Sequence, residues 1–274
     1  MKGEKISFLN SNVTRRIWFL PKIIFITFLA ITLFSTLAQA KEKIIIAAAA
    51  NLTSAMEEIC KDFEKENPTI DVEISYGSSG NFFAQIKQGA PFDVFFSADT
   101  TFPARLEEEG LAVKGWSKIY AFGSIVLWIP KKSALNPRKE LHLVLDPKVK
   151  KLAIANQRLA PYGMAAEEAL RYYGLWDKVQ DKLVFGENIS QTAQFVQSGA
   201  ADVGIIALSQ AISPKMENEG DYWIVPAESY NKLGQAYVVL QRGKDKPGVR
   251  RFLEFVQGKK GEKIFSQYGY SLPK

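Results

Sequence analysis

Short apolar runs alternate with segments of helical spacing along most of this chain, and this alternation is the strongest constraint on its fold. The first run, residues 44–50 (IIIAAAA), has the continuous apolar character of a strand that is buried on both faces of a parallel sheet. Apolar residues then recur at helical spacing over residues 52–63, in a segment that Pro68 ends. Strands that alternate with helices in this way indicate an α/β fold with mostly parallel sheets.

The same alternation continues to the end of the chain, and part of it is repeated. Residues 84–94 (AQIKQGAPFDV) align with residues 193–203 (AQFVQSGAADV) with identity at five of eleven positions, which favours two lobes of similar topology. We expect further strands over 71–76, 92–97, 151–155, 182–185 and 202–207, and further helices up to 89, over 164–173, up to 196, over 247–257 and over 261–268.

Two strands are expected to cross between the lobes, because no low-complexity linker occurs in the sequence. They are residues 123–130 (GSIVLWIP) and the return strand at residues 235–241 (QAYVVLQ). The chain should therefore divide into one lobe made of residues 41–122 plus 230–274, on which the last two helices pack, and a second lobe made of residues 123–229.

Residues 1–40 have the organisation of a secretory signal peptide. A basic start is followed by fifteen uncharged residues, 23–37, and then by Ala38-Gln39-Ala40. The apolar run is short for a membrane span, which needs about 20 residues. We expect cleavage after Ala40 and a soluble, exported chain; an uncleaved anchor is the alternative. Most of the net charge of +6 lies in this segment, so the rest is too weakly basic for nucleic-acid binding.

Several chemistries are excluded by what the sequence lacks. A single cysteine, Cys60, cannot form an intramolecular disulfide, and with the single histidine, His142, it cannot form a zinc cluster. P-loop and dinucleotide-binding motifs are absent. The turn at residues 76–80 (YGSSG) has Gly77 and Ser79 at the spacing of a nucleophile elbow, but Asn81 stands where that motif requires its last glycine. An enzyme is therefore not expected, although a Ser79–His142 pair in a secreted hydrolase stays open as the alternative from a different class.

Four junctions lead from a buried strand through small or polar residues into a helix. Helix N-termini leave backbone N–H groups unpaired and carry a partial positive charge, and in open α/β sheets they lie where ligands bind. The alternative is that each Ser or Asn only caps its own helix. The junctions contain no Lys, Arg or His, and they are residues 51–54, 78–81, 161–163 and 188–191.

Neutral donors gathered from such junctions suit an oxyanion that is fully deprotonated. A protonated anion such as hydrogen phosphate brings a donor that needs an acceptor, and an unpaired buried polar group costs about 1–3 kcal/mol. The pattern therefore favours a dianion such as sulfate, molybdate or tungstate over phosphate.

Motifs along the whole chain beyond residue 40 resemble the periplasmic molybdate-binding proteins of ABC transporters. The matching segments are 47–56 (AAAANLTSAM), 76–80 (YGSSG), 89–99 (GAPFDVFFSAD), 160–170 (APYGMAAEEAL), 186–199 (GENISQTAQFVQSG) and 264–269 (IFSQYG). The resemblance implies a two-lobed periplasmic-binding-protein fold, joined by crossing strands, which closes on molybdate or tungstate and delivers it to an ABC permease in the inner membrane.

The resemblance also implies the ligand contacts, and these fall on the junctions. Asn51 and the Ser79 side chain, together with the backbone N–H groups of Tyr162 and Ile189, would bind the oxyanion, and Ala50 would add a backbone contact. The only metal would be the molybdenum of molybdate, held through these same residues. One branch of the family places a tyrosine where this chain has Ala207, and the Asn51 amide or a backbone group is the alternative source of that donor.

The sequence thus predicts a periplasmic, monomeric solute-binding protein with no cofactor and no chemistry on its ligand. A site for another oxyanion such as sulfate is the alternative within the same class. Discrimination between molybdate and sulfate depends on the cavity radius, which residue types and spacing do not reveal.

Overall fold

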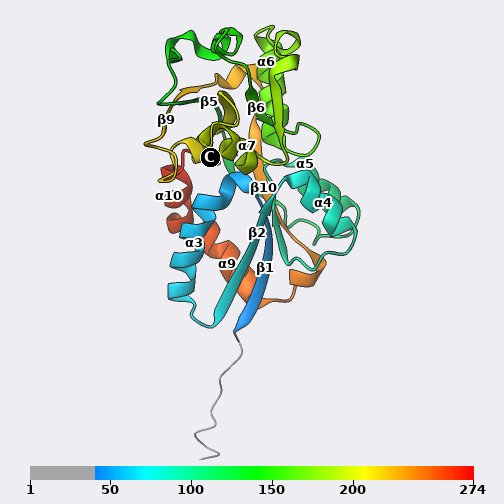
Figure 1. Cartoon of the computed structure of the whole chain (residues 1–274). Helices are drawn as coiled ribbons and strands as arrows, with labels where there is room; N and C mark the ends of the chain where they lie inside the picture. The colour runs from blue at the N-terminus through cyan, green and yellow to red at the C-terminus, as the bar shows by residue number, and fades with distance from the viewer. Residues whose placement is uncertain (1–40) are drawn as a thin grey trace, which may run out of the picture. The chain divides into compact units, whose positions relative to one another are not determined.

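The computed structural model of the chain describes residues 41–274, and these form one compact unit (Figure 1). The expected signal peptide, residues 1–40, lies outside the described residues. In the described part no helix combines the length and the hydropathy that a transmembrane span requires.

Two five-stranded sheets form the framework. The first has the strand order β2-β1-β3-β10-β4, and the second has the order β7-β6-β8-β5-β9. The strands of the first sheet are β1 (Glu42–Ala49), β2 (Ile70–Gly77), β3 (Val94–Phe96), β4 (Lys118–Gly123) and β10 (Leu233–Val239). The strands of the second are β5 (Ile125–Pro130), β6 (Leu152–Ala155), β7 (Leu183–Gly186), β8 (Val203–Ala207) and β9 (Gly220–Ile224).

Each sheet is mixed, with one strand reversed. β1 pairs in parallel with β2 and β3, whereas β10 is antiparallel to both β3 and β4. In the second sheet β6 is parallel to β7 and β8, and β5 is antiparallel to β8 and β9. The prediction of mostly parallel strand directions is therefore confirmed, and the reversed strands are the two that follow a crossing between the sheets.

Helices flank both sheets. They are α3 (Thr53–Glu66), α4 (Ser79–Lys87), α5 (Thr101–Glu108), α6 (Pro161–Tyr172), α7 (Ile189–Gln197), α8 (Leu208–Ala211), α9 (Pro247–Gln257) and α10 (Lys259–Gln267). Short 3₁₀ segments are η1 (Ala50–Leu52), η2 (Pro137–Leu145), η3 (Trp176–Lys178), η4 (Gln180–Lys182), η5 (Ala227–Ser229) and η6 (Gln241–Gly243).

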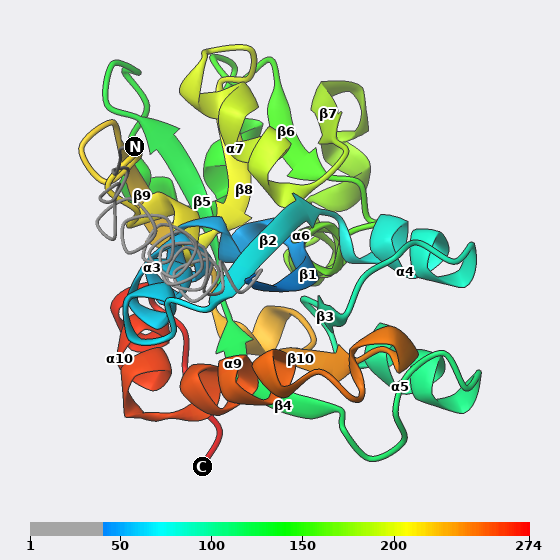
Figure 2. The same ribbon diagram turned by 90° about the horizontal axis from the view of Figure 1, so that it is seen from below.

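The two C-terminal helices pack on the first sheet, as predicted. Figure 2 shows α9 and α10 beside α3, and Phe63 of α3 meets Phe252 of α9 edge to face, with ring centroids 5.1 Å apart. The strands β4 and β9 were not predicted. Both lie at the edge of a sheet and expose large apolar side chains, Ile119 on β4 and Tyr222 on β9, so neither has the uniform apolar pattern of a buried strand.

The internal sequence match falls on equivalent elements. Residues 84–94 run from α4 into β3, and residues 193–203 run from α7 into β8. β3 and β8 are each the central strand of their sheet. The two halves therefore repeat one arrangement of strands and helices.

The chain crosses between the sheets twice. β4 ends at Gly123 and β5 begins at Ile125 in the other sheet, so the crossing strand expected over 123–130 is confirmed from Ile125 onward. The return passes through η5, between β9 and β10. These two connections agree with lobes of residues 41–122 plus 230–274 and of residues 123–229, which we retain as proposed boundaries.

Candidate functional site

The four strand-to-helix junctions meet where the two sheets face each other. On the first sheet, β1 leads into η1 and α3, and β2 leads into α4; on the second, β6 leads into α6 and β7 into α7. Gly80 N–H donates to Leu159 O at 2.8 Å, and Ser190 Oγ donates to Ala50 O at 3.0 Å. A Cβ at Gly80 would lie 2.9 Å from Leu159 O, so glycine is needed for this approach. The structure thus brings together the segments that the sequence singled out.

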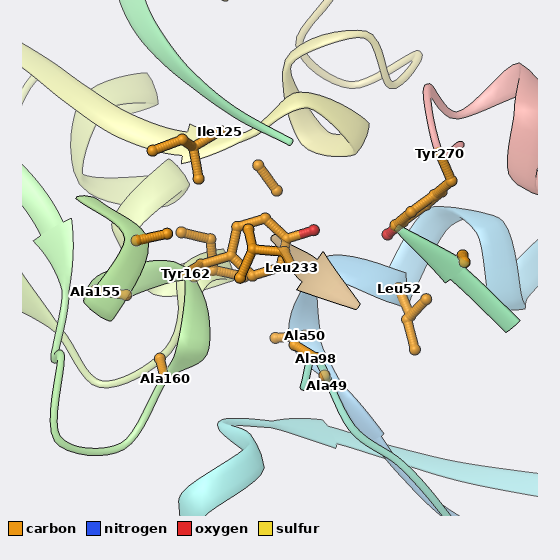
Figure 3. Packing of buried hydrophobic residues seen from close by; sticks show 14 of the residues in the cluster. Ala49, Ala50, Leu52, Ala98, Ile125, Ala155, Ala160, Tyr162, Leu233 and Tyr270 are labelled. Carbon is orange, nitrogen blue, oxygen red and sulfur yellow. The ribbon is translucent and has the colours of Figure 1, made fainter. Parts of the chain in front are cut away.

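All five predicted site residues are buried in this arrangement. Asn51, Ser79, Tyr162, Ile189 and Ala50 are between 1% and 3% exposed. Figure 3 shows Ala50 and Ala98 on the first sheet's side of the same cluster as Tyr162 and Ala160.

Asn51 does not cap the helix that it precedes. The N-cap of α3 is Leu52, and no side chain caps this end. Instead, Asn51 Nδ2 donates to Gln235 Oε1 and to the Tyr270 hydroxyl, both at 2.8 Å. The Asn51 carbonyl oxygen accepts from Ser209 Oγ at 3.0 Å. The capping interpretation is wrong for Asn51, which is held at the centre of a polar network.

The hydroxyl group of Ser79 is a donor without an acceptor among the described residues. The N-cap of α4 is Ser78, whose Oγ accepts from Asn81 N–H at 3.4 Å. Ser79 Oγ accepts from Ala98 N–H at 3.0 Å, and among the described residues its own proton has no acceptor. Ser79 N–H stands at the first position of the helix, where it has no intrahelical acceptor either. Two donors of one residue are therefore available to an anion.

Tyr162 and Ile189 occupy the starts of the two helices on the second sheet. Tyr162 is the second residue of α6, after Pro161, and Ile189 is the first residue of α7. Asn188 Oδ1 accepts from the N–H groups of Ser190 and Gln191, so the capping interpretation is right there and Ile189 N–H is left over. The geometry supports a donor role for both backbone groups.

The Ala207 position supplies no side-chain donor. Ala207 is fully buried at the end of β8, and its N–H faces Gln210 Oε1 at 3.4 Å. Tyrosine hydroxyls near the site include those of Tyr162 and Tyr270. Figure 3 shows these two hydroxyls pointing toward one another from opposite sides of the cluster.

Sequence reasoning missed the polar residues that support Asn51. Gln235 Nε2 donates to the Tyr162 hydroxyl at 2.8 Å, and the Tyr120 hydroxyl lies 3.1 Å from Gln235 Oε1 and 3.2 Å from Ser97 O. Tyr270 donates to the Asn51 carbonyl oxygen at 2.9 Å. The single sequence signal was Gln235 at the start of the strand expected over residues 235–241, where it is followed by five apolar residues; the structure has this strand as β10, Leu233–Val239.

The network is electrically neutral. Burial raises the pKa of Tyr270 to about 12 and raises the pKa values of Tyr120 and Tyr162 well above their ordinary value. All three therefore stay protonated at physiological pH. Over residues 41–274, no group of His, Cys, Asp and Glu is arranged to hold a metal cation.

The Ser79–His142 pair required by a hydrolase is not assembled. Ser79 is buried at the start of α4, beside the first sheet, and its Oγ is bonded to Ala98 N–H. His142 is exposed on η2, which packs against β5 and β9 of the second sheet, and its ring lies edge to face against Tyr173. This arrangement does not favour nucleophilic catalysis by Ser79.

Comparison with known proteins supports the resemblance seen in the sequence. The chain is 39% identical over 240 residues to the molybdate-binding protein ModA of Azotobacter vinelandii, an alignment that covers 88% of this chain and 94% of that protein. It is 37% identical over 245 residues to ModA of Rhodobacter capsulatus, covering 89% and 94% of the two chains.

Solved structures agree in fold. The periplasmic molybdate-binding protein of Azotobacter vinelandii matches with a TM-score of 0.79 and 33% identity, over 84% of this chain and all of that chain. The sulfate-binding protein SubI of Mycobacterium tuberculosis matches with a TM-score of 0.69 at 17% identity, which shows a shared fold alone.

The family model of the bacterial extracellular solute-binding proteins matches residues 44–271, nearly all of the described chain. The predicted resemblance and the two-sheet fold are confirmed by these comparisons. The chain belongs to the bacterial extracellular solute-binding proteins.

Proposed function

We propose that this protein binds molybdate, and also tungstate, between its two sheets and delivers the anion to an ABC permease. The observation that carries the proposal is the set of unused neutral donors at three facing helix starts. These are the hydroxyl and N–H of Ser79 and the N–H groups of Tyr162 and Ile189. The ModA relatives, which are named for molybdate binding, support this choice of ligand.

Such donors give enough affinity without a cation. A hydrogen bond to a charged group contributes about 1.5–3 kcal/mol, so these four donors with the proposed contacts of Asn51 and Ala50, less the costs of ordering and desolvation, supply the roughly −8 kcal/mol of micromolar binding. Because the donors offer no acceptor to a protonated anion, hydrogen phosphate is disfavoured. The donor set thus selects dianions, and the relatives' ligand singles out molybdate among them.

Binding is proposed to close the lobes, residues 41–122 plus 230–274 and residues 123–229, around the anion. Contacts between the sheets such as Asn81 Nδ2 to Glu187 Oε1, at 2.9 Å, would form in the closed state and break on opening. The permease would recognise that closed state. We further propose that the protein acts as a monomer, without a cofactor and without catalysis on its ligand.

Export through a cleaved signal peptide is part of the same proposal. Cleavage after Ala40 would release a periplasmic chain of 234 residues that begins at Lys41. Mass spectrometry of the exported protein tests this step, and retention of residues 1–40 on a membrane-bound product would contradict it.

The ligand is tested by titrating the purified, exported protein with molybdate, tungstate, sulfate and phosphate. Tryptophan fluorescence follows closure and equilibrium dialysis measures binding. We expect saturable molybdate and tungstate binding at micromolar concentration or below, and much weaker binding of phosphate. Tight sulfate binding without a molybdate response would replace the proposed ligand by sulfate. Ester hydrolysis abolished by His142→Ala would restore the hydrolase alternative.

A further inference from the structure

The side chain of Asn51, as the network orients it, presents the wrong atom to an anion. Both hydrogens of Asn51 Nδ2 are used, one by Gln235 Oε1 and one by the Tyr270 hydroxyl. The remaining atom, Oδ1, is buried and has no hydrogen-bond partner among the described residues. A carbonyl oxygen repels an oxyanion, so this orientation conflicts with a donor role for the Asn51 carboxamide.

A second atom of the network is also unused. Gln235 Nε2 donates to the Tyr162 hydroxyl at 2.8 Å, so the hydroxyl oxygen acts there as an acceptor. Tyr162 is buried, and within residues 41–274 its phenolic proton has no acceptor. An unpaired acceptor on Asn51 and an unused proton on Tyr162 thus lie at the two ends of one chain of hydrogen bonds, with Gln235 between them.

Turning both carboxamides by 180° gives the Tyr162 proton an acceptor and replaces the unpaired oxygen of Asn51 by a donor that an anion can pair, and apart from the two carboxamides only hydroxyl hydrogens have to rotate. A carboxamide's oxygen and nitrogen are nearly isosteric, so the turn exchanges donor and acceptor in place. Tyr162 then donates to Gln235 Oε1, Gln235 Nε2 donates to Asn51 Oδ1, and Asn51 Nδ2 is free to donate to a ligand.

The neighbouring hydroxyl groups can all form hydrogen bonds in the reversed network. The Tyr120 hydroxyl lies within reach of Ser97 O, at 3.2 Å, so it can donate there while it accepts from Gln235 Nε2. The Tyr270 hydroxyl can donate to Asn51 Oδ1, and Ser209 Oγ already donates to the Asn51 carbonyl oxygen at 3.0 Å. Each buried polar atom of the reversed network has a partner, with Asn51 Nδ2 paired by the anion.

We infer that Gln235 is a positioning residue that, in the reversed orientation, holds the Asn51 carboxamide with its NH₂ group toward the bound oxyanion. The inference rests on the proposed oxyanion binding and adds the residue that orients one of its donors. Gln235 itself does not touch the ligand. It also ties Asn51 of the first sheet to Tyr162 of the second, because its carboxamide bonds to both side chains.

Two substitutions at Gln235 separate positioning from packing. Gln235→Met keeps the approximate shape and removes the donor, so molybdate affinity should fall about tenfold, which corresponds to 1.4 kcal/mol. Gln235→Glu supplies only acceptors, holds Asn51 Nδ2 away from the anion and adds a like charge, so the loss should exceed about a hundredfold. Gln85→Met, at an exposed position of α4, is the matched control and should bind as the wild type does.

A double-mutant cycle and a spectroscopic measurement complete the test. In an Asn51→Ala background, Gln235→Met should change affinity by no more than about twofold, because its effect passes through Asn51. In ¹⁵N-labelled wild-type protein, molybdate should shift the side-chain amide signals of both Asn51 and Gln235, assigned by their loss in Asn51→Ala and Gln235→Met. This measurement needs no variant to bind ligand.

The outcomes are distinguishable. Wild-type protein that binds no tetrahedral oxyanion refutes the proposed function itself. If the wild-type protein binds molybdate, three results would refute the inference alone. They are full affinity in Gln235→Met, an effect of Gln235→Met that persists in the Asn51→Ala background, and a Gln235 side-chain amide signal that does not shift when molybdate is added.

Discussion

Replacing Ser79 by alanine tests the donor site most directly, because the structure predicts two separate losses. The Ser79 hydroxyl proton has no acceptor among the described residues, whereas Ser79 Oγ accepts from Ala98 N–H at 3.0 Å. Losing a hydrogen bond to a charged ligand should cost about 1.5–3 kcal/mol of binding free energy, which is roughly a 10- to 150-fold loss of affinity.

The second loss is in stability. Ala98 N–H, buried with Ser79, would have no acceptor, which costs about 1–3 kcal/mol. For a chain of this size each kcal/mol lowers the Tm by about 2–4 °C. Calorimetric titration with molybdate measures the first loss, and thermal unfolding without ligand measures the second.

The neighbouring Ser78 supplies the control. Ser78 Oγ caps α4 through Asn81 N–H at 3.4 Å, so Ser78→Ala should cost roughly 1 kcal/mol of stability and little affinity. If Ser79→Ala lowered the Tm but bound molybdate as tightly as the wild type does, Ser79 would only tie α4 to Ala98. The reasoning about its free proton would then be refuted.

Three further predictions concern Gly123 at the connection between β4 and β5, the hydroxyl of Tyr270 and the cap of α7. Gly123→Ala should weaken both affinity and stability, because its Cβ would lie 2.2 Å from the Tyr162 hydroxyl and 2.5 Å from Gln235 Nε2; an unchanged molybdate titration would contradict this. Since burial raises the pKa of Tyr270 to about 12 from about 10 when unfolded, its contribution to stability is complete below pH 10 and is lost as pH rises toward 12. Thermal unfolding should show this decline, and Tyr270→Phe should make it less steep. Asn188→Ala should remove the N-cap of α7, which lowers the free energy of unfolding by about 1 kcal/mol and therefore lowers the Tm, while dialysis shows near-normal molybdate binding.

The strands that could be predicted from the sequence are those with a continuous apolar run or, like β2, a regular alternation of buried and exposed residues. β8 and the part of β1 from residue 44 onward are apolar because both faces of each strand are largely covered, and their predicted positions agree with the structure to within about two residues. The edge strands β4 and β9 are half exposed and mixed in composition, so no period distinguishes them from loops. Tertiary pairing alone makes them strands.

For the candidate site, the helix starts could be predicted but not their environment. Small and polar residues after a buried strand mark a helix start locally, and that is how the junctions at residues 78–81 and 188–191 were found. The choice of Ser79 and Ile189 within them came from the family resemblance. Which hydroxyl caps a helix and which one is free depends on contacts such as Ala98 N–H to Ser79 Oγ. Ser78 and Ser79 are adjacent and chemically identical, and only the fold gives them different roles.

The Asn51–Gln235 pair illustrates why the remainder is beyond sequence patterns. The two residues are 184 positions apart and meet because β10 returns to the first sheet beside β3, which pairs with β1. Once they meet, their carboxamides have two orientations, of which one leaves Asn51 Oδ1 without a donor and the other offers an Asn51 N–H to the ligand. A ligand that accepts hydrogen bonds selects that orientation, and a cation would select the other. A network that contains no charge of its own can therefore respond to the polarity of the ligand.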